Sequence, residues 1–334
     1  MRKSFLLLVV ILLLSLVLSA CATDESAQTG LITITDSTGH SEQFETLPDR
    51  IVIAGRATVM VQDAVFLFPE ALEKVVAVEN RKQSLFVFLP LIDPAIEDKA
   101  VLEMNAGAEQ IAALEPDLVI MKNFMADQLG APLAELDIPV LYLDLETPEA
   151  FYEDISVLGQ VFGAAERADE VVDFYQNRVE TVGSTTADLD DASKPDVLLL
   201  SYNDKGEEIA FEAPPASWLQ TSLVELAGGN PVWTEASQAG GWAVVSFEQI
   251  AAWDADQIYI IDYKGRGSEI VEDLYADPLW AELSATQNNE VYAFAFDYYS
   301  WDQPDTRWVL GLEWLAIKFQ PELFSDLSIT DDAE

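Results

Sequence analysis

The chain has 334 residues, a length that fits two domains of ordinary size or one large one. Half of its residues are hydrophobic, enough to bury a sizeable core despite a formal net charge of -42. The 59 acidic residues outnumber 17 basic ones and repel phosphate backbones, so DNA and RNA are poor partners. A single cysteine and a single histidine exclude an intrachain disulfide and most histidine-based metal sites and catalytic triads.

The N-terminus has the pattern of a secretory signal peptide. Two basic residues precede an apolar run at 5–18, which would span about 21 Å as a helix and not the roughly 30 Å core of a membrane. Residues 1–20 are therefore expected to be cleaved off. The sequence Leu18-Ser19-Ala20-Cys21 resembles a bacterial lipobox, which implies that lipid attached to Cys21 anchors the protein to a membrane. The polar stretch 21–30 is expected to be a flexible tether.

Residues 31–163 alternate short apolar runs with segments of helix length. Alternating residues at 31–35 and 43–45 flank turn residues and predict an opening hairpin. The apolar runs that follow lie at 51–54, 75–78, 118–121 and 140–143. This alternation predicts an α/β lobe with a mostly parallel sheet.

The second half repeats the alternation and predicts a second α/β lobe at 191–334. Its strand-like runs lie at 197–200, 258–261 and 291–296, and its helical patterns at 218–227 and 306–319. Between the two halves, residues 165–184 carry apolar side chains at helical spacing. A helix of that length is a rod of roughly 30 Å, so we expect one long linking helix within residues 164–190.

One internal repeat indicates that the two halves are related. The segment from Glu109 to Ile120 aligns without a gap with the segment from Glu248 to Tyr259, and six of the twelve positions are identical. Each copy is expected to form a short helix, a turn and a strand. Two lobes of related topology with a ligand cleft between them follow from this repeat.

Several segments together resemble one known family, the two-lobed, single-helix substrate-binding proteins of ABC importers for ferric siderophores, haem and cobalamin. They are the lipobox, the Thr35–Gly39 turn, Pro48–Val52, the two repeat copies, the linking helix, Ala227–Gly229 and Trp301–Pro304. The resemblance covers essentially the whole mature chain. It implies two Rossmann-like lobes and a monomer that works with an ABC permease dimer and its ATPase. It also implies that Glu109 and Glu248 dock onto the permease, which suits carboxylates on two rigid lobes.

Ligands of such sheets bind beyond the carboxyl ends of the strands, so residues that follow the strands are candidates for the site. The candidate ligand-binding residues are Arg56, Arg81, Lys122, Tyr202, Trp218, Trp242, Tyr299 and Trp301. Nearly half of the few basic residues fall near strand ends, which indicates an anionic ligand. Surface charge scattered over exposed loops is the alternative explanation.

The predicted function is an extracytoplasmic, lipid-anchored protein that captures a ferric siderophore or a similar anionic metal chelate. Haem, cobalamin and an oxyanion such as molybdate stay open as ligands, although the segment 80–84 lacks the aromatic residues that cobalamin favours. No cofactor and no bare metal site is expected. Catalysis is not expected, because Cys21 is assigned to lipid and His40 lies in the predicted hairpin turn. A surface glycoside hydrolase that uses two carboxylates is the less favoured alternative.

Overall fold

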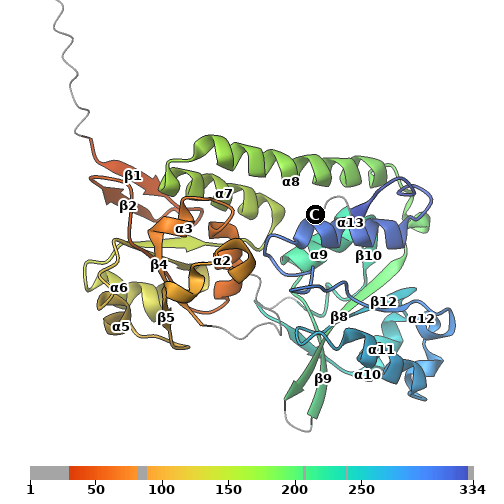
Figure 1. The fold of residues 1–334 in the computed structure, drawn as a ribbon. Helices are drawn as coiled ribbons and strands as arrows, with labels where there is room; N and C mark the ends of the chain where they lie inside the picture. The colour runs from red at the N-terminus through yellow and green to blue at the C-terminus, as the bar shows by residue number, and fades with distance from the viewer. Residues whose placement is uncertain (1–29, 81–88, 206–207, 238–239, 330–334) are drawn as a thin grey trace, which may run out of the picture.

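The computed structural model describes residues 30–80, 89–205, 208–237 and 240–329. Within these ranges the chain forms two α/β lobes, and the 22-residue helix α8 (Ala165–Thr186) runs along one side of both (Figure 1). The predicted signal peptide, the predicted lipid site at Cys21 and the tether up to residue 29 lie outside the described residues. No helix in the described part of the chain is long and apolar enough to cross a membrane.

The N-terminal lobe is built on a five-stranded sheet in which every pairing is parallel, in the order β5-β4-β3-β6-β7. Its strands are β3 (Ile51–Ile53), β4 (Val75–Glu79), β5 (Ala100–Leu102), β6 (Leu118–Lys122) and β7 (Val140–Leu143), after an antiparallel hairpin of β1 (Ile32–Thr35) and β2 (Ser41–Phe44). Its helices are α2 (Thr58–Val65), α3 (Ala71–Lys74), α4 (Leu89–Ile92), α5 (Ala108–Ala112), α6 (Ala131–Ala134) and α7 (Pro148–Phe162). The apolar runs form strands because helices cover both faces of a parallel sheet, and β3 and β6 are buried at every residue.

The C-terminal lobe combines parallel and antiparallel strands. Its strands are β8 (Asp196–Lys205), β9 (Glu208–Ala213), β10 (Asn230–Pro231), β11 (Ala243–Val245), β12 (Gln257–Ile261) and β13 (Val291–Ala293). Its helices are α9 (Leu219–Leu226), α10 (Phe247–Trp253), α11 (Gly267–Ala276), α12 (Ser284–Gln287) and α13 (Trp308–Phe319). β8 pairs in parallel with β10 and β12, whereas β9 and β11 add an antiparallel edge. The predicted fold class, two α/β lobes joined by one long helix, is confirmed.

The internal repeat has the same structure in both lobes. Its copies form α5 followed by β6 and α10 followed by β12. The carboxylate of Asp117 accepts the backbone N–H of Arg50 at 2.8 Å, and Asp256, at the same position of the second copy, accepts that of Asp196 at 2.9 Å. Arg50 and Asp196 lead into the neighbouring strands β3 and β8, so each aspartate fixes the entry of a central strand.

An aromatic cluster at the junction ties the lobes together. The side chain of Trp308, at the start of α13, is fully buried, and its ring lies 5.7 Å from the ring of Phe151 on α7 and 5.2 Å from that of Tyr175 on α8. The hydroxyl of Tyr175 donates to the backbone carbonyl of Thr306 at 2.6 Å. Aromatic pairs at such distances stabilise beyond the area they bury, so this cluster strengthens the packing of α7, α8 and α13 against one another.

Two buried carboxyl groups lie at the same junction. Asp63 on α2 is 2% exposed and Asp305, in the loop before α13, is fully buried. Burial raises the pKa of Asp63, and the charge of Asp305 raises it further against the opposing charge of Arg307. Burial also raises the pKa of Asp305, to about 8. The two groups resist simultaneous ionisation, because neither charge is hydrated.

Candidate functional site

A cavity of about 630 Å³ lies between the two lobes. Its lining residues are Ala57, Met60, Asn123, Phe124, Asp144 and Glu146 from the N-terminal lobe and Trp218, Gln220, Gly240, Trp242, Tyr263, Lys264, Gln303 and Pro304 from the C-terminal lobe. Asn123, Asp144 and Tyr263 come just after β6, β7 and β12, at the carboxyl ends of parallel strands. This is where sheets of this type bind ligands.

Three aromatic rings form the wall on the side of the C-terminal lobe. The rings of Trp218 and Trp242 meet edge to face with centroids 6.0 Å apart, and Trp242 meets Tyr263 in the same way at 6.4 Å. Tyr202 lines an adjoining hollow together with Trp242 and Tyr263. Of the eight expected ligand-binding residues, the structure therefore brings Trp218, Trp242 and Tyr202 together.

The sequence pattern placed Tyr202 after the end of a strand, but in the structure Tyr202 lies within β8. β8 continues through it to Lys205 and pairs with β9, and Tyr202 lies opposite Phe211 in that ladder. The prediction ended the strand at Leu200 because its hydrophobic run ends there. The strand continues through polar residues because their backbone pairs with β9. Such backbone pairing cannot be predicted from the hydrophobicity of the side chains.

Arg56 lies at the rim of the cavity beside β3. Its guanidinium stands 5.9 Å from the ring centre of Phe124, which lines the cavity, and the side chain is exposed. This cation–π contact leaves its hydrogen-bond donors available for a ligand. Arg81, the second arginine expected in the site, lies outside the described residues.

Lys122 is placed differently from the expectation. It is the last residue of β6 and is fully buried, and its Nζ donates to Glu146 Oε1 at 2.7 Å and to the backbone carbonyl of Asp144. A buried ammonium group needs such partners, because desolvation without them is costly. Lys122 therefore holds the segment after β7 in place, and it is Asp144 and Glu146 that line the cavity.

Two other basic residues near the cavity are also engaged by acids. Lys264 pairs with Asp204, and Arg266 bonds to Asp204 at 2.6 Å and to Asp262 at 2.7 Å. Hydrogen bonds from Arg266 and then Lys264 lower the pKa of Asp204 to about 2. Of the basic residues expected at the strand ends, the described structure pairs Lys122, Lys264 and Arg266 with neighbouring carboxylates and leaves Arg56 without an ion pair.

Tyr299 and Trp301 do not line the cavity. Tyr299 is 5% exposed and lies in a turn closed by a bridge between Phe296 and Ser300, and Trp301 packs against the hydrophobic core. Their neighbours Gln303 and Pro304 reach the cavity instead. The loop enters the site, but two residues later than the aromatic pattern indicated.

A hydrogen-bonded group that the sequence did not reveal supports the aromatic wall. Gln220, only 3% exposed, donates through Nε2 to Asp302 Oδ2 at 3.1 Å, and the Tyr263 hydroxyl donates to the same oxygen at 2.8 Å. Burial raises the pKa of Asp302, and donors including Ser300, Tyr263 and Gln220 oppose that shift. Tyr263 could have been found from its position two residues after β12. Gln220 gave no signal, because a glutamine inside an amphipathic helix is ordinary.

The two glutamates expected to dock onto a permease occupy equivalent places. Glu109 and Glu248 are the second residues of α5 and α10, and both are exposed. Hydrogen bonds from its own backbone and from Ser246 hold the pKa of Glu248 below its usual range. Figure 1 shows α5 and α10 on the side of the molecule that faces away from α8, one on each lobe. The pair therefore marks one face of the protein at two separated points.

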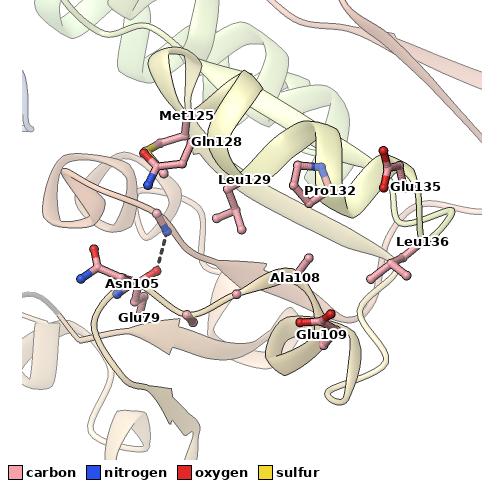
Figure 2. A pocket seen from close by; sticks show the side chains of 13 residues that line it. Glu79, Asn105, Ala108, Glu109, Met125, Gln128, Leu129, Pro132, Glu135 and Leu136 are labelled. Carbon is pink, nitrogen blue, oxygen red and sulfur yellow. Dashed lines mark hydrogen bonds between the residues drawn. The ribbon is translucent and has the colours of Figure 1, made fainter.

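A second hollow, of about 340 Å³, lies within the N-terminal lobe beside Glu109 (Figure 2). At its inner end Glu79, 1% exposed, accepts the backbone N–H groups of Gly55 at 2.6 Å and Asn105 at 2.7 Å. Both carboxylate oxygens thus hold the loops that follow β3 and β5. Because all of its lining residues belong to one lobe, this hollow is not the cleft predicted between the lobes.

Comparisons with known proteins agree with this architecture. Residues 96–298 match the family model described as Periplasmic binding protein. The molybdate-binding protein MolA of Haemophilus influenzae is 25% identical over 314 residues, which cover 85% of this chain and 84% of that protein. The iron(3+)-hydroxamate-binding protein YxeB of Bacillus subtilis is 22% identical over 200 residues, covering 59% of this chain and 61% of YxeB.

Solved structures show the same fold. The structure of MolA from Haemophilus influenzae bound to molybdate superposes with a TM-score of 0.71 at 20% identity and covers 90% of this chain and 94% of that one. A periplasmic solute binding protein from Veillonella parvula also gives a TM-score of 0.71, at 23% identity, with 91% of each chain covered. The chain therefore belongs to the Periplasmic binding protein family and is a substrate-binding protein of the ABC-importer type.

Proposed function

We propose that this protein captures a ferric siderophore or a similar metal chelate between its lobes and delivers it to an ABC permease. The observation that carries the proposal is the cavity of about 630 Å³, which has an aromatic wall on one lobe and individual polar side chains from both lobes. Pockets for drug-sized molecules have volumes of about 300–1,000 Å³ and combine mostly apolar walls with a few placed polar groups. A chelate that wraps iron in oxygen donors has that size and offers flat or apolar surface to Trp218, Trp242 and Tyr263.

Molybdate is the second candidate, because MolA covers most of this chain and was solved with molybdate bound. A four-oxygen anion would fill only a small part of the cavity. It would also need several free donors, whereas Lys122, Lys264 and Arg266 are engaged by carboxylates. The cavity therefore favours the larger ligand.

Titration with ligands distinguishes these candidates. We expect a ferric siderophore to bind with one-to-one stoichiometry and to quench tryptophan emission, because Trp218 and Trp242 line the cavity. Phenylalanine at both positions should remove most of the quenching and preserve binding measured by calorimetry. Binding of molybdate alone would favour the second candidate, and turnover of a glycoside would contradict a carrier function altogether.

We also propose that the mature chain is held on the outer face of a membrane by lipid on Cys21. The lipobox pattern at the end of the apolar leader supports this placement. The tether that follows would let the lobes reach a permease in the same membrane. A monomer suffices for this task, since one chain supplies both walls of the cavity.

Docking is proposed to use Glu109 and Glu248. The double substitution Glu109→Ala with Glu248→Ala should leave ligand affinity unchanged and abolish uptake in cells, because neither residue lines the cavity between the lobes. The matched control is Asp169→Ala with Asp173→Ala, which removes two exposed acids from α8 on the other side of the molecule. Loss of ligand affinity in the docking variant, or equal loss of uptake in the control, would refute the assignment.

A further inference from the structure

The charges and hydrogen-bonding groups of the cavity indicate which chelates it accepts, an inference that rests on the proposed function. Asp144 and Glu146 both line the cavity. Asp144 accepts one hydrogen bond from the side chain of Asn123 at 2.7 Å, and Glu146 is 23% exposed beside its buried partner Lys122. Of the basic side chains described around the cavity, only Arg56 has no ion pair. The N-terminal wall therefore offers carboxylate oxygens.

Gln220 adds an acceptor on the opposite wall. Its Nε2 donates to the Asp302 carboxylate, so the amide orientation is fixed, because the flipped amide would set its oxygen against that carboxylate. The remaining atom, Oε1, is buried and has no hydrogen-bond partner in the described chain. A buried acceptor without a donor is unfavourable, so this side of the wall disfavours a ligand that brings a further acceptor, such as a carboxylate, against it.

The aromatic wall also favours a positively charged group on the ligand. Trp218, Trp242 and Tyr263 stand edge to face around one side of the cavity, and Phe124 lies on the opposite lobe. Faces of aromatic rings carry negative electrostatic potential and attract ammonium groups. The protein as a whole, at a formal net charge of -42, also attracts cations toward its surface.

We propose that the transported chelate carries a protonated amine on its outer surface, which binds Asp144 and the aromatic wall, and that it has no net negative charge. This reverses the expectation of an anionic ligand. That expectation counted basic residues near strand ends, and in the described part of the chain Lys122, Lys264 and Arg266 are paired with acids.

The test compares two ferric trihydroxamates that differ only in the amine. The full chain in detergent is titrated with ferrioxamine B, whose primary amine is protonated, and with its N-acetylated form, in which that nitrogen carries no charge. We expect the amine form to bind about tenfold more tightly, since a desolvated ammonium contact of this kind is worth that factor. In Asp144→Asn the ratio of the two affinities should fall to near one. The control Asp173→Asn removes the same charge from exposed α8 and should keep the native ratio.

The possible results separate this inference from the proposed function. Equal affinity for the two trihydroxamates, or tighter binding of ferric citrate than of ferrioxamine B, overturns the preference for an amine and leaves the carrier function intact. An unchanged affinity ratio in Asp144→Asn also overturns it. Failure to bind any of the ferric chelates overturns the proposed function together with the inference.

Discussion

Replacing Trp308 by alanine is expected to lower the free energy of unfolding by about 3–5 kcal/mol, the usual cost of deleting a buried tryptophan ring. The ring is fully buried and packs on Phe151 and Tyr175, so its loss opens a cavity where α7, α8 and α13 meet. Its Nε1 has no hydrogen-bond partner in the described chain, so the loss is one of packing and not of hydrogen bonding. Urea unfolding followed by far-UV circular dichroism measures the change.

Trp308→Phe is the matched control for this prediction. It keeps an aromatic ring at the junction and should cost clearly less than the alanine variant, roughly 1–3 kcal/mol. A loss below about 1 kcal/mol in Trp308→Ala would show that the junction repacks around the missing ring, and that the lobes are not held by this cluster.

Raising the pH is expected to destabilise the protein, and Asp305→Asn should weaken that dependence. Burial raises the pKa of Asp305 to about 8, so the folded protein keeps a proton that the unfolded chain releases near pH 4. Between these values the folded state binds more protons than the unfolded state. The free energy of unfolding therefore falls as pH rises, by an amount on the order of a few kcal/mol.

Urea unfolding at about pH 5 and about pH 8 measures this dependence. Asparagine cannot ionise and can still accept the backbone N–H of Arg307, which lies 2.7 Å from Asp305 Oδ1. The variant should retain part of the slope, because burial also raises the pKa of Asp63 and, to about 6, the pKa of Asp154. The exposed control Asp169→Asn should match the native protein. A native protein whose stability rises over this range would contradict the buried, protonated state of Asp305.

The two-lobed fold could be predicted from the sequence because its signals are local. Runs such as residues 118–121 and 140–143 are apolar at nearly every position, as strands covered on both faces must be, and they appear as β6 and β7. The periodicity of residues 165–184 predicted the linking helix, which is observed as α8. The edge strands β9 and β11 escaped prediction because exposed residues such as Ile209 and Val244 do not follow a buried pattern.

The candidate site could be predicted only in outline. The rule that ligands bind beyond the carboxyl ends of strands pointed to the cavity, and it also pointed to Lys122. The sequence cannot show that Lys122 lies inward against Glu146, because that ion pair joins residues that follow different strands. Tyr299 and Trp301 were equally ambiguous, since an aromatic residue in a loop can line a pocket or close the core beneath it.

The loop before α13 contacts both the cavity and the linking helix α8. Gln303 and Pro304 form part of the cavity wall, and two residues later the backbone accepts the hydroxyl of Tyr175 on the linking helix. The loop lies so close to α13 that a side chain at Gly311 would collide with the carbonyl of Trp301. Because the loop is held both at the cavity and at the linking helix, we expect a ligand that displaces Gln303 or Pro304 to shift α13 relative to α8 as well.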